Sequence, residues 1–177
     1  RILSEQEQVR RDALNKLRDK GIDPYPAAEY SVSHKSTEIL KNFVEGSSDF
    51  ENVSMAGRIM TRRIMGKASF AVLKDSFGDI QLYFNRDEIC TGEDKSMYND
   101  VFKKMLDMGD FIGIKGSVFN TQTGETSVLV KEFTVLSKSL KPLPVVKTDA
   151  DGNIHDAFAD PELRYRQRYV DLVVNEN

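Results

Sequence analysis

Apolar and polar residues alternate along the middle of the chain with a period of two, which is typical of half-buried β-strands. The alternation occurs in three runs, at residues 53–59, 70–74 and 80–85. Residues 76–79, with the sequence SFGD, favour a turn, so the second and third runs are predicted to form a β-hairpin. One face of this hairpin would be core. The outward face would carry Phe70, Lys74, Gln81 and Tyr83.

Apolar residues recur at helical spacing on both sides of these strands. Ser4 and Glu7 have the spacing of a capping box, which predicts a helix over residues 4–20, and further helices are predicted over 36–44 and 97–108. The basic residues of the first helix admit two interpretations, a solvated face or a face that lies along an RNA backbone, and its acids weaken the second. The expected core positions are Val9, Ala13, Leu14 and Leu17 in the first helix and Tyr98, Val101, Phe102, Met105 and Leu106 in the third.

Two further strands are predicted over residues 111–119 and 127–136, joined by a turn at 121–125. Gly113 and Gly116 inside the fourth strand indicate a bend or bulge, which a barrel needs at its corners. Three strands, a helix and two strands is the element order of an OB-fold. The predicted fold class is therefore mainly β: a five-stranded Greek-key OB-fold barrel with a helix between strands three and four, preceded by N-terminal helices. Strands two and three, with the loops between strands one and two and between four and five, form the ligand face of this fold.

The pattern predicts three parts of the chain. Residues 1–50 form an N-terminal helical extension, residues 51–140 the OB-fold domain, and residues 141–177 a linker and a helix. This last helix is expected over 160–174, with Pro161 in its first turn. Because it has no core of its own, we expect the chain to be a fragment of a longer protein.

Composition adds a local excess of positive charge to this picture. The 177-residue chain has a net charge of -3, yet residues 53–74 contain five basic side chains and no acid. A polyanion responds to such a cluster within about one Debye length, roughly 8 Å at physiological salt, more than to the net charge. Together with the outward side chains of the hairpin, this charge suits an unpaired base and its phosphate. The five basic residues are Arg58, Arg62, Arg63, Lys67 and Lys74.

Patterns for catalysis and metal binding are absent from the sequence. No nucleophile with a neighbouring base, pair of catalytic carboxylates, zinc spacing or complete phosphate loop can be assembled. We therefore predict binding without catalysis, and no catalytic residue, metal ligand or cofactor in this part of the protein. The sequence contains no run of 18 apolar residues, the length that could span a membrane, so no membrane partner is expected. The single cysteine, Cys90, and the lack of an apolar signal peptide indicate a cytoplasmic protein.

Five segments carry a more specific signal, and they cover nearly the whole chain in order. They are LRDKGIDPYP (17–26), AGRIMTRRIMGKASF (56–70), GDIQLYFNRDE (78–88), TGETSVLVKEFTVLSKSLKPLP (123–144) and DPELRYRQRYVDLVVN (160–175). Together they resemble the N-terminal part of class II lysyl-tRNA synthetases, and the second and fifth segments are not general OB-fold features.

The resemblance implies an anticodon-binding OB-fold that precedes a class II catalytic domain. The parent enzyme would then be a lysine–tRNA ligase, which attaches lysine to tRNA using ATP and magnesium. The three motifs of that catalytic domain are absent here, so the fragment is expected to be inactive alone. The implied partner is lysine tRNA, through its anticodon loop. The resemblance also implies a homodimeric parent, whereas we expect the fragment to be a monomer.

Residue roles follow from the resemblance as well. In aspartyl, asparaginyl and lysyl enzymes an Arg, a Phe and a Gln recognise the middle uridine of the anticodon, and the matching pattern here is Arg63, Phe70 and Gln81. Lysyl members add a glutamate, which falls on Glu125; the alternative is that Glu125 is only a polar turn residue. The residues alone do not decide between Arg62 and Arg63; the resemblance favours Arg63, with Arg62 at a phosphate or packed locally. The predicted nucleic-acid-binding residues are Arg63, Phe70, Gln81, Glu125, Arg62, Lys67, Lys74 and Tyr83.

Two alternatives to this function stay open. One is the OB-fold of an aspartyl- or asparaginyl-tRNA synthetase. The other is a general single-stranded nucleic-acid-binding OB module, which would also use stacking rings and basic residues. An OB-fold that binds proteins is disfavoured by the concentrated positive charge.

Overall fold

The computed structural model describes residues 2–144, 147–148, 154–155 and 158–175. Contacts divide the chain into two units, residues 1–140 and residues 141–177, and each is described by itself.

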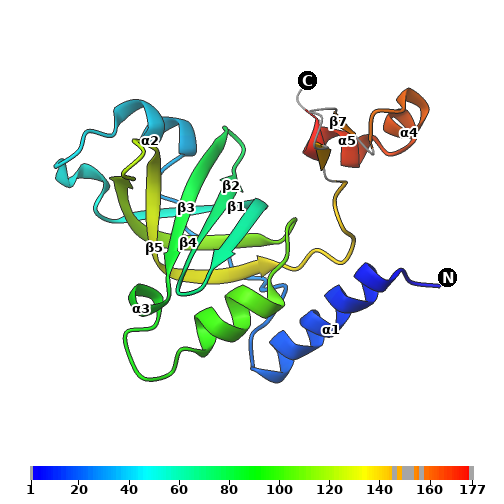
Figure 1. The fold of residues 1–177 in the computed structure, drawn as a ribbon, viewed down its shortest axis with the longest axis horizontal. Helices are drawn as coiled ribbons and strands as arrows, with labels where there is room; N and C mark the ends of the chain where they lie inside the picture. The colour runs from blue at the N-terminus through cyan, green and yellow to red at the C-terminus, as the bar shows by residue number, and fades with distance from the viewer. Residues whose placement is uncertain (1, 145–146, 149–153, 156–157, 176–177) are drawn as a thin grey trace. The chain divides into compact units, whose positions relative to one another are not determined.

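The first unit is built around a closed barrel of five strands (Figure 1). Neighbouring strands follow the order β1-β2-β3-β5-β4, and β4 pairs back with β1. The β3 and β5 strands are parallel, whereas the other pairs are antiparallel. This is the topology of an OB-fold, so the predicted fold class is confirmed. The strands are β1 (Val53–Met65), β2 (Ala68–Lys74), β3 (Asp79–Asn85), β4 (Phe111–Asn120) and β5 (Thr126–Ser137).

Short helices connect the strands and flank the barrel. The predicted first helix is present with its capping box, in which Ser4 and Glu7 exchange backbone and side-chain hydrogen bonds. The predicted third helix is a π-helix that ends at Met105, earlier than expected, and a short helix at Arg86–Ile89 precedes it. The helices of this unit are α1 (Glu5–Asp19), α2 (Ser36–Asn42), η1 (Ser48–Phe50), α3 (Arg86–Ile89) and η2 (Met97–Met105).

Aromatic rings of η2 fill one end of the barrel core. Phe102 stacks on Phe84 with ring centroids 4.1 Å apart, and Tyr98 stacks on Phe102 at 5.6 Å. The Tyr98 hydroxyl shares a 2.7 Å hydrogen bond with Ser69 Oγ, so its polar atom is satisfied inside the core. All five core positions predicted for this helix are buried, as predicted.

The α1 helix packs on η2 through a stripe that differs from the predicted one. Ala13, Leu14 and Leu17 are buried, but Val9 is 49% exposed, so its prediction as a core residue was wrong. Arg10 takes that place because it lies on the same helical face as Leu14 and Leu17. Its guanidinium donates hydrogen bonds to Met108 O at 3.0 Å and to a second carbonyl at 3.2 Å. One basic residue of this helix is therefore a structural clamp.

A buried ion cluster holds the chain where it leaves β5. Lys138 Nζ lies 2.5 Å from Asp107 Oδ2 and 2.8 Å from Asp110 Oδ2, and the Lys138 and Asp110 side chains are fully buried. The backbone N–H of Ser139 donates to Asp110 at 2.7 Å. Burial raises the pKa of Asp110, against the opposing effect of the Lys138 charge.

The two glycines of β4 have different structural roles. The ladder with β5 shifts its register between Lys115 and Gly116, because β5 has one extra residue, Lys131, at this point; the predicted irregularity is present, but the bulged strand is β5. A Cβ on Gly116 would lie 1.9 Å from the carbonyl oxygen of Leu129, which excludes any other residue without a backbone shift. Gly113 instead leaves room for the ring of Tyr30, which a Cβ would approach to 2.4 Å.

The second unit contains a two-stranded ladder, β6 (Lys147–Thr148) with β7 (Ile154–His155), and two helices, α4 (Pro161–Arg166) and α5 (Arg168–Val174). The single helix predicted over 160–174 is broken at Gln167, whose backbone leaves the helical region with φ -117° and ψ 51°. None of the described helices is long and apolar enough to cross a membrane.

Candidate nucleic-acid interface

A bulge in β1 decides which way its two adjacent arginines point. The ladder between β1 and β2 skips one residue of β1 between Ile59 and Thr61. After this skip, Arg62 lies opposite Ala71 and Arg63 lies opposite Phe70. Residues directly opposite in a ladder share a face, and Ala71 is a core residue. Arg62 is therefore on the barrel's inner side, and Arg63 is on the outer side.

Arg62 is used inside the fold. Its Nη1 donates to the carbonyl oxygen of Phe102, and its guanidinium lies 5.6 Å from the centroid of the Phe102 ring. Burial lowers the pKa of Arg62, because the charged form loses part of its hydration. Of the two roles predicted for Arg62, local packing fits this geometry and a phosphate contact does not.

Arg58 is engaged in the same manner. Its Nη1 donates to Gly109 O at 3.0 Å, and its guanidinium lies 4.4 Å from the Phe111 ring centroid. Burial lowers its pKa too. Two of the five basic residues in the predicted cluster are thus bound to backbone carbonyls, and the positive charge left at the surface comes from Arg63, Lys67 and Lys74.

A row of aromatic rings lies beside Arg63 on the outer face. Phe70 of β2 and Tyr83 of β3 are directly paired, and their ring centroids are 5.1 Å apart with a tilt of 47°. The ring of Phe119, from β4, meets Tyr83 edge-on at 5.9 Å. All three side chains are half-buried. The sequence prediction included Phe70 and Tyr83 but missed Phe119, which the alternation with buried Val118 would have placed on the outer face.

Gln81 and Lys74 continue the outer face away from the rings. Gln81 is half-buried and lies two residues from Tyr83 along β3, opposite Val72. Lys74 lies opposite Asp79, and its position four residues from Phe70 corresponds to about 13 Å along the strand. Gln81 is therefore next to the rings on the outer face, whereas Lys74 lies farther away, at the end of β2.

The turn between β1 and β2 is the exposed tip next to Arg63. Gly66 has a positive φ of 65°, which a two-residue turn between these strands requires. Its carbonyl accepts a hydrogen bond from the Tyr98 hydroxyl at 3.2 Å, which ties the tip to η2. Lys67 is exposed at this tip, and Met65 beside it is 43% exposed.

Glu125 lies in the loop between β4 and β5, where the sequence predicted it. The loop is closed by hydrogen bonds from Thr121 N to Glu125 O at 2.9 Å and from Glu125 N to Thr121 Oγ1 at 3.0 Å. The Glu125 side chain is exposed. Just after the loop, Ser127 pairs with Gln81 on one side and Phe119 on the other. The loop therefore adjoins the outer face that carries the rings.

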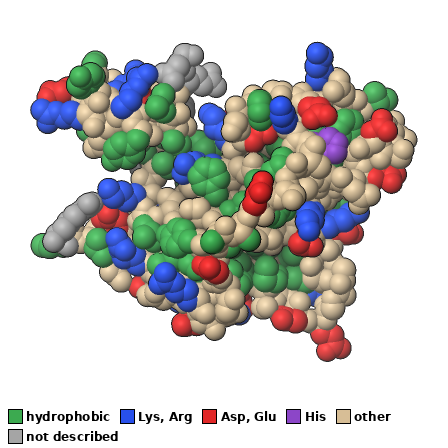
Figure 2. Space-filling view, turned by 180° about the vertical axis from the view of Figure 1, so that it is seen from behind, with side chains coloured by type: hydrophobic (Ala, Val, Ile, Leu, Met, Phe, Trp, Pro, Cys, Tyr) green, Lys and Arg blue, Asp and Glu red, His purple; other side chains and the backbone are tan. Residues whose placement is uncertain are grey.

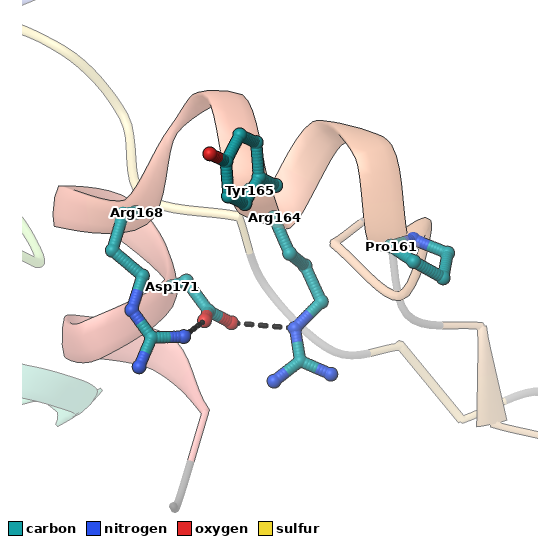
Figure 3. Close-up of a pocket in the computed structure, with 5 residues that line it drawn as sticks. All are labelled: Pro161, Arg164, Tyr165, Arg168 and Asp171. Carbon is teal, nitrogen blue, oxygen red and sulfur yellow. Dashed lines mark hydrogen bonds and ion pairs between the residues drawn. The ribbon is translucent and has the colours of Figure 1, made fainter.

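The second unit contains a hollow of about 470 Å³ with a different chemistry (Figure 3). Buried Asp171 accepts hydrogen bonds from Arg164 Nε at 2.6 Å and Arg168 Nη1 at 2.8 Å, so it joins α4 to α5. Hydrogen bonds from Asn175 and then Arg164 lower the pKa of Asp171 and keep it ionised. This arrangement is a structural ion pair, and no residue of the predicted site lines the hollow.

On the face shown in Figure 2, lysine and arginine side chains are interspersed with acidic and hydrophobic ones. The outer face of β1–β3 combines aromatic rings, an amide and basic residues.

Comparison with known proteins finds one family that matches the barrel and relatives that match nearly the whole chain. Residues 53–136 match the tRNA anti-codon family, described as an OB-fold nucleic acid binding domain. The chain is 64% identical over 173 residues to the lysine–tRNA ligase of Christiangramia forsetii, covering 98% of this chain and 30% of that relative. It is 62% identical over 177 residues to the lysine–tRNA ligase of Porphyromonas gingivalis strain W83, with 99% and 30% covered. For the lysine–tRNA ligase of Azobacteroides pseudotrichonymphae the identity is 60% over 174 residues, with 98% and 34% covered. The chain spans 30–34% of the length of these curated relatives.

Proposed function

We propose that this chain, whose residues 53–136 belong to the family of OB-fold nucleic acid binding domains, is the anticodon-binding part of a lysine–tRNA ligase. Its role would be to recognise the anticodon loop of lysine tRNA.

One observation carries the proposal: Arg63, Phe70 and Gln81 share the outer face of the β1–β3 sheet. The Phe70 ring offers a stacking surface to the middle anticodon base, whatever its identity. The Gln81 amide carries both donors and an acceptor, so it can pair with the edge of a uracil, which presents both. Arg63 supplies a charged donor to the same base or to its phosphate.

Other predicted residues have supporting roles in this proposal. Tyr83 holds the Phe70 ring from the neighbouring strand, and Lys67 and Lys74 attract the phosphate backbone from either end of the hairpin. Glu125 can only accept hydrogen bonds when ionised, and its charge repels phosphate, so it would face donors on a base. Arg62 is not among the proposed contacts, because its guanidinium bonds to the Phe102 carbonyl.

The activity of the whole protein is part of the proposal. It would attach lysine to tRNA with ATP and magnesium, in the cytoplasm, as a homodimer, whereas the chain alone would be monomeric and would charge no tRNA. No group of three or more His, Cys, Asp or Glu side chains in the described part of the chain could hold a metal ion.

A second candidate is a general module for single-stranded RNA, which the stacking rings alone would also suit. The two are separated by measuring the affinity of the chain for a lysine anticodon stem-loop, for the same stem-loop with the middle uridine changed to cytidine, and for an unstructured RNA of equal length. Anticodon recognition predicts that the first RNA binds more tightly than the other two. Equal affinities for all three would favour the general module and refute the proposal.

Two variants sharpen this experiment. Gln81→Ala should reduce the preference for uridine over cytidine more than it reduces affinity, since the amide that reads the base edge is gone. Glu125→Gln should change the preference at one anticodon position. If Gln81→Ala weakens every RNA equally, the base-reading role is wrong; if Glu125→Gln changes no preference, Glu125 is a polar turn residue.

A further inference from the structure

Phe119 is an aromatic residue that the fold does not need for its core. The β4 strand alternates at this point, with Val118 buried and Phe119 half-buried on the outer face. Phe119 is separate from the main hydrophobic core of the first unit. Its ring contact is with Tyr83, at 5.9 Å and an angle of 64°. A large apolar ring kept at a partly exposed position is a common feature of surfaces that bind a partner.

The position of Phe119 joins the two parts of the candidate interface. Its backbone lies two strands away from β3, with β5 between them, because Ser127 of β5 pairs with both Phe119 and Gln81. The Phe119 ring nevertheless reaches Tyr83 on β3. It is also the penultimate residue of β4, close to the loop that carries Glu125. The rings of Phe70, Tyr83 and Phe119 therefore form a continuous row from Arg63 to this loop.

We infer that Phe119 stacks on the base that neighbours the middle anticodon base, so that the interface holds two consecutive unpaired bases. This inference rests on the proposed function. Tyr83 lies between the two stacking rings and contacts both, at 5.1 Å and 5.9 Å, which sets their spacing. The second base then lies beside the Glu125 loop, where a carboxylate can accept hydrogen bonds from donors on its edge.

The test uses stem-loops that each lack one base, leaving an abasic sugar at the first, middle or third anticodon position. Binding of the chain to each RNA is measured for wild type, Phe119→Leu, Phe119→Tyr and Phe70→Leu. Phe77→Leu is the matched control, because Phe77 is a 53% exposed ring in the β2–β3 turn, away from the row. Thermal unfolding of each variant verifies that the barrel is intact.

Phe119→Leu should weaken binding of the complete stem-loop about 5-fold or more, the lower end of the range for base–aromatic stacking, while Phe119→Tyr keeps the ring and stays within about twofold of wild type. The decisive result is which abasic position in the RNA removes the effect of each protein substitution. The effect of Phe119→Leu should disappear with an abasic site at one flanking position, whereas the effect of Phe70→Leu should disappear with an abasic site in the middle.

Two failures can be told apart. If Phe119→Leu has the same effect on every abasic RNA, or none, while Phe70→Leu keeps its dependence on the middle base, the inference about Phe119 is wrong and the proposed function stands. If wild type binds the complete and the abasic stem-loops equally well, the proposed function fails, and the inference fails with it.

Discussion

Arg62 and Arg63 are adjacent in sequence, yet the bulge in β1 predicts opposite consequences for substituting them. We consider Arg62→Met and Arg63→Met, which keep most of each apolar stem and remove the charge. Removing the Arg62 guanidinium leaves the Phe102 carbonyl without its donor and takes away the contact with the Phe102 ring. An unsatisfied buried polar group costs about 1–3 kcal/mol. For a unit of this size, each kcal/mol lowers the unfolding temperature by about 3–5 °C.

Arg63 is exposed and points away from the core, so Arg63→Met should change the unfolding free energy by no more than about 0.5 kcal/mol. It should instead weaken binding of the lysine anticodon stem-loop about 10- to 100-fold, because a hydrogen bond to a charged group contributes about 1.5–3 kcal/mol. If Arg63 contacts a phosphate, the slope of log affinity against log salt should also fall by about 0.7.

Urea unfolding and a binding titration on both variants decide the matter. For Arg62→Met we expect reduced stability, with near-normal affinity once the protein concentration is corrected for the folded fraction. For Arg63→Met we expect normal stability and reduced affinity. A loss of affinity at full stability for Arg62→Met, or an unfolded Arg63→Met, would refute the assignment of faces that follows from the bulge.

Three further substitutions test the fold that positions the interface, each by urea unfolding. Burial acts to raise the pKa of Asp75, but hydrogen bonds, led by those from Ser36, lower this pKa below its ordinary value of 3.8. The ionised Asp75 therefore stabilises the fold above pH 3.8, and this stabilisation is lost as the pH falls through the lowered pKa. Asp75→Asn should flatten this acid dependence of the unfolding free energy. Lys138→Met should lower the unfolding free energy by about 3–5 kcal/mol because Asp110 stays buried without its partner, and adding Asp110→Asn should recover part of the loss. Gly116→Ala should cost at least the roughly 1–3 kcal/mol typical of overpacking, since its Cβ would lie 1.9 Å from the Leu129 carbonyl oxygen of β5; a variant as stable as wild type would show that the bulged part of β5 can relax.

The sequence was sufficient for the fold because local patterns determine most of it. Alternation in β2 and β3 identified their inner and outer faces, and Phe70 and Gln81 are on the outer face as predicted. The capping box of Ser4 and Glu7 correctly marked the start of α1. These features depend on residues a few positions apart, which a sequence shows directly.

The features that the sequence did not reveal depend on contacts between distant segments. Period-two alternation fails at a bulge, so the sequence could not decide between Arg62 and Arg63, and the structure decides it through one skipped residue in the β1–β2 ladder. Arg10 and Arg58 look like surface charges in a sequence, but both donate hydrogen bonds to distant backbone carbonyls. The acceptor of Arg10 at Met108 is 98 residues away in the chain, and the acceptor of Arg58 at Gly109 is 51 residues away. Alternation with Val118 would have placed Phe119 on the outer face, but only the contact with Tyr83 of another strand shows that it belongs to the row of rings.

The central claim is that the middle base of the lysine anticodon lies on the outer face of the β2–β3 hairpin. The most direct test is a lysine anticodon stem-loop that carries 5-iodouridine at the middle position, irradiated in complex with the protein and analysed by mass spectrometry of the cross-linked peptides. We predict a cross-link at Phe70 or Tyr83, which Phe70→Ala reduces. A cross-link confined to α1 or to residues 158–175 would contradict the account.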